Sequence, residues 1–506
     1  MPQQPAARPS IPVIDVFAGP GGLNEGFASF QDGAAFDVVG SFEMDDASIA
    51  TLTTRATQRL LRRPDGTNHP VHEGLLRGQL SLETFTSHHA VRDRWDQAAR
   101  HVHKVELGPD TRDESDALIS AALEGLGANG RWVLIGGPPC QAYSMAGRSR
   151  RKHDVTFESD KKHFLYREYL HIIEKFKPAV FVMENVKGML STTHGGSGLF
   201  DRIQHDLKFP GGVFAGQRYR LRSLTVHSKS VQNPRDFVVR SEHHGVPQAR
   251  HRVIMIGIRE DVHIVAPDGW AALAPSPKVT LRDVLQELPA VRSRVSPRSA
   301  DSPARWEEIR DEALGDVRGE ATPSEGGHWV SGRRQVEDRP EARKLLSWLR
   351  PQAPDAEVGF AQHEARAHMQ SDLLRYAYLA DKALRGERPK VQDLPESLRP
   401  AHKNLDADVV PFADRFRVQR WDHPSSTVVA HLSKDGHYFI HPDPVQMRSI
   451  TVREAARLQT FPDDYFFAGN RTKQFQQVGN AVPPFLAHQI AQRVHGLLTH
   501  GDSSDA

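Results

Sequence analysis

Five short apolar runs in the first half of the chain constrain its fold most strongly. Most of their residues are β-branched or aromatic, which is typical of strands buried in a parallel sheet. The runs span residues 12–17, 36–42, 132–135, 179–183 and 253–258. Between the third and fourth runs, apolar residues recur at helical spacing over residues 165–176, and Lys177-Pro178 ends that helix. The alternation of strands and helices predicts a doubly wound, Rossmann-like α/β fold.

The residues that directly follow these runs carry functional groups. A glycine-rich turn at residues 17–27 follows the first run, Glu43 the second, Cys140 the third and Glu184 the fourth. Glycines let a backbone approach a ligand closely, and an acid after the second strand is placed to accept hydrogen bonds from ribose hydroxyls. Because ligands bind at the carboxyl ends of parallel strands, we expect these groups to meet at one edge of the sheet.

Cys140 is the only cysteine in the chain of 506 residues. Pro138 and Pro139 precede it, and two prolines fix φ and hold the next side chain in one direction at a strand end. A buried cysteine that acts as a small hydrophobic residue is the alternative, but this rigid setting favours a nucleophile. A single cysteine forms neither an internal disulfide nor a thiolate zinc site. The sequence also contains the histidine pairs His88-His89, His101-Val102-His103 and His243-His244, but they lack cysteine or carboxylate partners at ligand spacing, so we expect no metal.

Composition indicates where the protein acts. The N-terminal residues lack the apolar core of a signal peptide, and no later segment is apolar enough to span a bilayer, so we expect a cytoplasmic protein without a membrane partner. The formal net charge of +2 is too small to indicate a nucleic-acid partner by itself. Any phosphate-binding surface must therefore be local. The candidates are basic runs at residues 148–152, 218–222 and 292–298, for which plain solvated surface is the alternative.

Six segments resemble, in the same order, the motifs of the DNA (cytosine-5) methyltransferase family of the bacterial restriction-modification type. They are Asp15-Val16-Phe17-Ala18-Gly19-Pro20-Gly21-Gly22, Gly137-Pro138-Pro139-Cys140-Gln141, Glu184-Asn185-Val186, Gln248-Ala249-Arg250-His251-Arg252, Arg453-Glu454-Ala455-Ala456-Arg457-Leu458-Gln459 and Gln477-Val478-Gly479-Asn480-Ala481-Val482-Pro483-Pro484. Enzymes that methylate exocyclic nitrogens carry an Asp/Asn-Pro-Pro-aromatic motif instead. The resemblance implies an S-adenosylmethionine-dependent, Rossmann-like methyltransferase domain with a smaller target recognition domain.

The chemistry of the reaction explains the catalytic residues that the resemblance implies. Carbon 5 of cytosine becomes nucleophilic only after a thiolate, here that of Cys140, adds to carbon 6. Glu184 would bind the exocyclic amine and N3, so that protonation of N3 removes the developing negative charge. Arg252, with Arg250 nearby, would hold the O2 of the ring and support the carboxylate. The base that removes the carbon 5 proton is not identified by the sequence.

The resemblance also implies a cofactor site and a DNA-binding loop. S-adenosylmethionine would donate the methyl group without a metal. Its binding residues would be Phe17, Gly19, Gly21, Gly22, Glu43, Met44, Glu106, Pro138, Leu165 and Asn480. Asp110 is the alternative to Glu106 for contact with the adenine amine, and on spacing alone Leu165 is equally well placed in the core. Gln141, Ser144 and Arg148 would contact phosphate or fill the gap left when the target base leaves its stack.

The order of the motifs predicts a domain organisation. We expect a disordered tail at 1–11, a catalytic domain at 12–274 with an insertion at about 51–104, a target recognition domain at 275–415, and a C-terminal part at 416–498 that returns to the catalytic domain. Arg59, Arg62 and Arg63 in the insertion are candidates for DNA contacts or plain surface. An apolar stripe on a helix from Met369 to Leu384 is expected to be domain core.

The resulting hypothesis is an enzyme that methylates a flipped-out cytosine in double-stranded DNA, in restriction-modification or phage defence. A cognate restriction endonuclease or other defence components are the expected partners, and we expect a monomer. A tRNA cytosine-5 methyltransferase is one alternative, although such enzymes usually have a shorter recognition region. A non-enzymatic DNA-binding regulator is the other, although it would be expected to have lost the thiol or the carboxylate.

Overall fold

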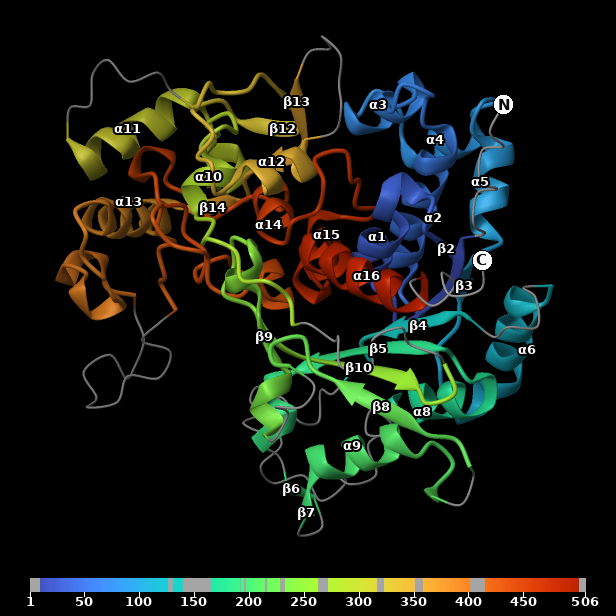
Figure 1. The fold of residues 1–506 in the computed structure, drawn as a ribbon. Coiled ribbons are helices and arrows are strands. Elements are labelled where there is room, and N and C mark those ends of the chain that lie inside the picture. The colour runs from blue at the N-terminus through green and yellow to red at the C-terminus, as the bar shows by residue number, and fades with distance from the viewer. Residues whose placement is uncertain are drawn as a thin grey trace.

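The computed structural model describes residues 10–125, 131–139, 165–191, 193–194, 197–213, 216–227, 233–262, 272–315, 323–350, 358–400 and 415–499. At its centre is a sheet in the order β3-β2-β1-β4-β5-β10-β8, with β9 also paired to β10 (Figure 1). Its strands are β1 (Ile11–Val16), β2 (Phe36–Glu43), β3 (Val102–Lys104), β4 (Val133–Gly136), β5 (Val180–Val186), β8 (Tyr219–Arg222), β9 (Val238–Arg240) and β10 (His251–Arg259).

The strands confirm the doubly wound fold, with one correction. Strands β2, β1, β4 and β5 are parallel, as the apolar runs predicted, and the short strand β3, which was not predicted, adds to them in parallel. The fifth predicted run lies in β10, which is antiparallel to both β5 and β8. In its described residues the connection from β8 to β10 holds β9 and two 3₁₀ turns instead of the crossover α-helix that usually joins parallel strands, and β9 itself pairs antiparallel with β10.

Alternating residues of the central strands enter two different cores. Val13, Ile135 and Val182 belong to one hydrophobic cluster, whereas their neighbours Ile14 and Leu134 belong to the other. Side chains point to opposite faces at successive strand positions, so both faces of the sheet are buried. The first cluster also contains residues from 279–349 and from 428–498. The C-terminal segments therefore contribute to the core of the N-terminal sheet.

Helices cover both faces of this sheet. α8 (Leu165–Phe176) confirms the predicted helix, and α16 (Pro484–Thr499) lies against α1 (Gly22–Ala28), as Figure 1 shows. The other helices of the N-terminal half are α2 (Asp46–Leu61), α3 (Pro70–Leu76), α4 (Leu82–Ser87), α5 (Arg92–Ala99), α6 (Arg112–Leu123) and α9 (Leu199–Lys208). Among the described residues, no helix is long and apolar enough to cross a membrane.

The later half of the chain contains small sheets and further helices. Its strands are β11 (Arg294–Ser296), β12 (Gly326–Ser331), β13 (Gly359–Glu364) and β14 (Ala367–Met369), and a hairpin of β6 (Thr193–His194) and β7 (Ser197–Gly198) precedes them. Its helices are α10 (Leu281–Leu285), α11 (Pro303–Leu314), α12 (Arg343–Leu349), α13 (Gln370–Leu384), α14 (Val452–Leu458) and α15 (Arg471–Asn480). The apolar stripe is buried along α13 at Leu373, but Met369 and Leu384 are each 57% exposed because they lie at the helix ends.

Candidate active site

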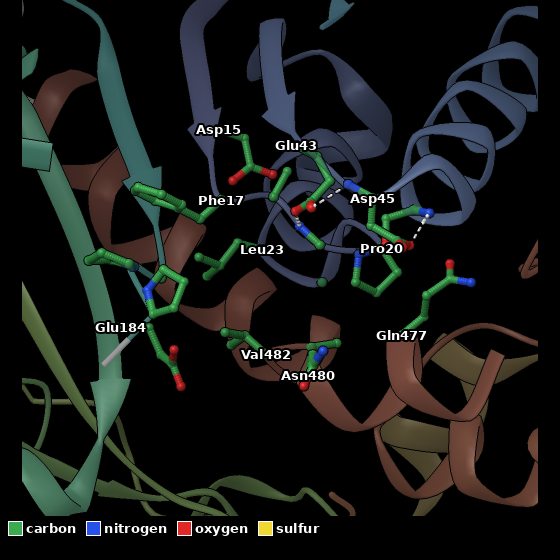
Figure 2. Close-up of a pocket in the computed structure, with 18 of the residues that line it drawn as sticks. Asp15, Phe17, Pro20, Leu23, Glu43, Asp45, Glu184, Gln477, Asn480 and Val482 are labelled. Carbon is green, nitrogen blue, oxygen red and sulfur yellow. Dashed lines mark hydrogen bonds between the residues drawn. The ribbon is translucent and has the colours of Figure 1, made fainter. Parts of the chain in front are cut away.

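A cavity of about 490 Å³ lies at the carboxyl ends of β1, β2, β4 and β5, and is lined by residues at or directly after these ends. Figure 2 shows Phe17 and Glu43 from the N-terminal strands, Glu184 on β5, and Asn480 and Val482 from the C-terminal part around this space. Most of the residues expected in the site line it. They are Phe17, Gly19, Gly22, Glu43, Met44, Glu106, Pro138, Leu165, Glu184, Arg250, Arg252 and Asn480. Cys140, Gln141, Ser144 and Arg148 lie outside the described residues.

The glycine-rich loop after β1 has an unusual backbone. Phe17, Gly19 and Gly21 all have positive φ, at 55°, 55° and 90°. A positive φ is strained for a residue with a side chain, and such strain is found where a site must be held in one shape. Gly21 is not a lining residue: a Cβ there would lie 2.7 Å from Cδ2 of Leu52. Gly21 therefore turns the loop and allows packing behind it.

Glu43 ties this loop to the end of β2. Its Oε2 accepts a hydrogen bond from the backbone N–H of Gly19 at 2.8 Å. Its Oε1 accepts from the backbone N–H groups of Met44 at 2.8 Å and Asp45 at 3.0 Å. A carboxylate oxygen has more than one lone pair, so Glu43 retains capacity to accept a hydrogen bond from a ligand in the cavity.

Asp15 is a cavity residue whose role the sequence reasoning missed. It is 1% exposed, and neither carboxylate oxygen has a hydrogen-bond partner among the described residues. Burial, and then the charge of Glu43, raise the pKa of the Asp15 carboxyl well above its usual value. A buried polar group without a partner costs free energy, which a cationic or hydrogen-bond-donating ligand would offset. The signal in the sequence was its place at the start of the first motif.

Glu184 and Arg252 form an ion pair at the cavity wall. Nε of Arg252 lies 2.8 Å from Oε1 of Glu184, and the two side chains are 16% and 13% exposed. They meet because β5 and β10 are antiparallel neighbours, with Ile254 of β10 opposite Glu184. Gly137 makes room for the carboxylate, since a Cβ at this position would lie 2.9 Å from Oε2 of Glu184.

Asn185 connects β5 to the turn that leads to Cys140. Its side-chain amide donates to the carbonyl oxygen of Pro138 at 3.1 Å, and its side-chain oxygen accepts from the backbone N–H of Val186 at 2.8 Å. Asn185 is buried and lines the cavity. The sequence reasoning quoted this residue as part of a motif but gave it no role. Its contacts hold the Pro138-Pro139 turn at a fixed place beside Glu184.

Arg250 makes different contacts from those expected. Its guanidinium is buried and donates to the carbonyl oxygens of Val428 at 2.9 Å and Gly479 at 3.2 Å. The carboxylate of Glu184 is paired with Arg252 instead. In this structure Arg250 joins β10 to two C-terminal segments.

Several candidate phosphate-binding arginines are engaged in ion pairs. Arg292 is buried and contacts Asp301 at 2.9 Å and Glu325 at 2.5 Å. In the insertion, Arg59 is paired with the buried Glu25, and Arg62 lies 3.4 Å from Asp464. The expected alternatives were DNA contact and plain surface, but the contacts of Arg59 and Arg292 favour a third role for these two residues, in the scaffold.

The arrangement fits a cationic, nucleoside-like ligand. The cavity combines unpartnered and partly partnered carboxylates, a ring at Phe17 and the exposed side chain of Met44. Within the described ranges, no group of three or more His, Cys, Asp or Glu could hold a metal ion.

Comparisons with known proteins agree with this geometry. The family model described as C-5 cytosine-specific DNA methylase matches residues 79–496. The chain is 32% identical over 498 residues to the type II methyltransferase M.Bpa9945I of Bacillus paralicheniformis, with 96% of this chain and 99% of that protein covered. It is 30% identical over 393 residues to the type II methyltransferase M.AgeI of Thalassovita gelatinovora, covering 72% of this chain and 82% of that protein. A solved structure of a prophage-encoded E. coli protein aligns over 97% of this chain and 99% of its own, at 19% identity and a TM-score of 0.54, which shows a shared fold.

Proposed function

Because the chain belongs to the C-5 cytosine-specific DNA methylase family, we propose that it methylates carbon 5 of a cytosine turned out of duplex DNA, through a covalent bond to Cys140. Its family makes it a DNA (cytosine-5-)-methyltransferase of the bacterial restriction-modification type. The family and the fold imply S-adenosylmethionine as methyl donor. The observation that carries the proposal is the Glu184–Arg252 ion pair, which lies on the same cavity as the glycine-rich loop.

The described residues fit S-adenosylmethionine in charge and shape. Asp15 is a buried carboxylate without a partner at the cavity, and the methionine part of this donor carries positive charge. Glu43 would accept from the ribose hydroxyls, and the side chains of Phe17 and Met44 would pack on the adenine. Gly19, Gly22, Glu106, Pro138, Leu165 and Asn480 would complete the pocket. When bound, the donor supplies an electrophilic methyl group on a positively charged sulfur.

Different protein residues carry out the steps that activate the cytosine ring. The Cys140 thiolate forms a bond to carbon 6, which pushes electron density to carbon 5. Glu184 gives a proton to N3 as this bond forms, so the ring stays neutral and carbon 5 can take the methyl group. A base then removes the carbon 5 proton, the bond between sulfur and carbon 6 breaks, and the N3 proton returns to Glu184. Arg252 holds one oxygen of that carboxylate throughout.

The remaining expectations extend this proposal to DNA and partners. Gln141, Ser144 and Arg148 would contact the DNA or fill the gap left by the flipped base, which costs a few kcal/mol to extrude. Residues 275–415 would read the target sequence, with 12–274 and 416–498 forming the catalytic part. We propose that the protein acts as a monomer in the cytoplasm, with a cognate restriction endonuclease cutting the same unmethylated sequence.

The deciding experiment incubates the purified protein with S-adenosylmethionine and unmethylated genomic DNA, followed by base-resolution sequencing for 5-methylcytosine. We expect methylation at one recurring sequence. A duplex containing 5-fluorocytosine at that sequence should form a stable adduct with the wild-type protein and none with Cys140→Ser. An adduct with Cys140→Ser would overturn the mechanism, and methylation of tRNA in place of DNA would favour the tRNA alternative.

A further inference from the structure

A buried tyrosine supports the glycine-rich loop from the side opposite the cavity. The hydroxyl of Tyr465 donates a hydrogen bond to the carbonyl oxygen of Pro20 at 2.5 Å. Pro20 lines the cavity, as Figure 2 shows, whereas Tyr465 is 1% exposed and is not a lining residue. The residues are 445 positions apart in sequence. Tyr465 thus contacts the backbone of the loop without access to a ligand.

The loop needs such support because its own backbone preferences do not fix its shape. Phe17 has a positive φ, which is strained for a residue with a side chain, whereas Gly19 and Gly21 adopt their positive φ easily but have many other conformations open to them. Glu43 fixes the loop at the N–H of Gly19, next to Pro20 in sequence. Tyr465 fixes the carbonyl group of Pro20, and its hydroxyl also lies 3.0 Å from the position that a Cβ on Gly21 would take. These two side chains therefore hold the peptide units on either side of the Gly19–Pro20 bond.

Tyr465 is itself held in place by a buried ionic cluster. The guanidinium of Arg55 lies over its ring, 5.0 Å from the centroid. Arg55 contacts Glu25 of α1 at 2.6 Å and Asp464 at 2.9 Å, and all three side chains are nearly fully buried. Burial, and then the charge of Glu25, raise the pKa of Tyr465, so its hydroxyl stays a donor. The direction of the hydroxyl is therefore set by the scaffold.

We infer that Tyr465 is a positioning residue that keeps the glycine-rich loop in its cofactor-binding shape. The inference rests on the proposed function, in which this loop binds S-adenosylmethionine. If the loop leaves the binding shape for part of the time, the apparent dissociation constant rises by the inverse of the remaining fraction. The segment between α14 and α15 would thus tune cofactor affinity from behind the site.

The test is Tyr465→Phe, which keeps the ring and removes only the hydroxyl. We expect the dissociation constant for S-adenosylhomocysteine, measured by calorimetry, to rise about 2- to 10-fold, because one hydrogen bond is lost. Amide hydrogen exchange in the ligand-free protein should become faster in a peptide covering residues 17–28 and stay unchanged in β4 and β5. The matched control is Tyr376→Phe, which removes a buried hydroxyl bonded to Nδ1 of His437 at 2.6 Å, and should leave both readouts at the wild-type value.

The possible outcomes separate this inference from the proposed function. Unchanged affinity and unchanged exchange of the loop in Tyr465→Phe would overturn the inference. A similar loss of affinity in Tyr376→Phe would also overturn it, since general destabilisation would then be the cause. A wild-type protein that does not bind S-adenosylhomocysteine would contradict the proposed function. In that case, amide hydrogen exchange of the glycine-rich loop in the ligand-free protein would still test whether Tyr465 stabilises the loop.

Discussion

The cavity wall and the scaffold behind the glycine-rich loop treat buried carboxylates in opposite ways. At the wall, Asp15 has no hydrogen-bond partner among the described residues, and burial and Glu43 raise its pKa. In the scaffold, Glu25 is paired with Arg55 and Arg59. Burial alone would raise the pKa of Glu25, but these ion pairs outweigh burial and lower it to about 2.

This difference separates residues that await a ligand from residues that complete the fold. Buried polar groups in proteins are normally satisfied, so an unsatisfied carboxylate at a cavity marks a place where another molecule supplies the partner. Glu184 is an intermediate case, because Arg252 satisfies one of its oxygens at the cavity wall. The predictions below test this distinction, from the largest expected effect to the smallest.

Glu184→Gln should have the largest effect on catalysis. A glutamine keeps the shape but cannot give a proton to N3, so single-turnover methylation should slow about 10²- to 10⁴-fold while S-adenosylhomocysteine binds as in the wild type. Glu242→Gln is the control, because Glu242 is also paired, with His251 at 2.8 Å, but does not line the cavity. A rate for Glu184→Gln equal to that of the control would remove Glu184 from the mechanism.

Arg55→Met should have the largest effect on stability. It leaves Glu25 and Asp464 buried without their shared cation, and breaking a buried ion pair in this way costs about 3–5 kcal/mol. The free energy of unfolding in urea measures this loss. Arg305→Met is the control: its pair with Glu308 is exposed, at 43% and 64%, and should cost at most about 1 kcal/mol. An equal loss of unfolding free energy in the two variants would show that the buried ion pairs of Arg55 contribute no more to stability than an exposed pair.

Asp15→Asn should weaken ligand binding and stabilise the ligand-free protein against unfolding. In the complex, the cationic amino group of the ligand would pair with an ionised Asp15, and an asparagine cannot ionise, so the dissociation constant for S-adenosylhomocysteine should rise about 10- to 100-fold. In the ligand-free protein, the pKa of Asp15 is higher in the native state than in the unfolded state. Above the usual Asp pKa, the unfolded state therefore releases a proton that native Asp15 still holds, so the free energy of unfolding of the wild type falls as pH rises. The variant lacks this dependence and should be the more stable protein at pH 7, by an amount that shrinks toward pH 4 in urea titrations.

Asp116→Asn serves as its control. Asp116 is buried but is paired with Lys175 at 2.7 Å and does not line the cavity. Its neutralisation should lower stability and leave ligand binding unchanged. If Asp15→Asn behaves in the same way, Asp15 belongs to the scaffold and the distinction between the two regions fails.

Local sequence signals were sufficient to predict β1, β2, β4, β5 and β10 as strands, the helix at 165–176, and the places of Glu43 and Glu184 at strand ends. The short strands β3, β8 and β9 of the same sheet were not predicted. A capping box of Thr451 and Glu454, another signal within four consecutive residues, begins α14. Such features depend on residues near in sequence. The direction of β10 and the contacts of Arg250 and Arg59 depend on partners that are distant in sequence, such as Val428 for Arg250. The unsatisfied state of Asp15 also follows from packing, so only the structure could reveal it.

Asn185→Ala should have the smallest effect on catalysis, and it tests a single hydrogen bond at the cavity wall. The alanine removes the hydrogen bond to Pro138, which holds the turn before Cys140 beside Glu184. One hydrogen bond is worth about 1 kcal/mol, so the rate of adduct formation with 5-fluorocytosine DNA should fall about fivefold. Binding of S-adenosylhomocysteine should change less than the rate of adduct formation, because the turn contributes only Pro138 to the proposed cofactor pocket. A change confined to cofactor binding would mean that the two halves of the cavity are coupled through this turn.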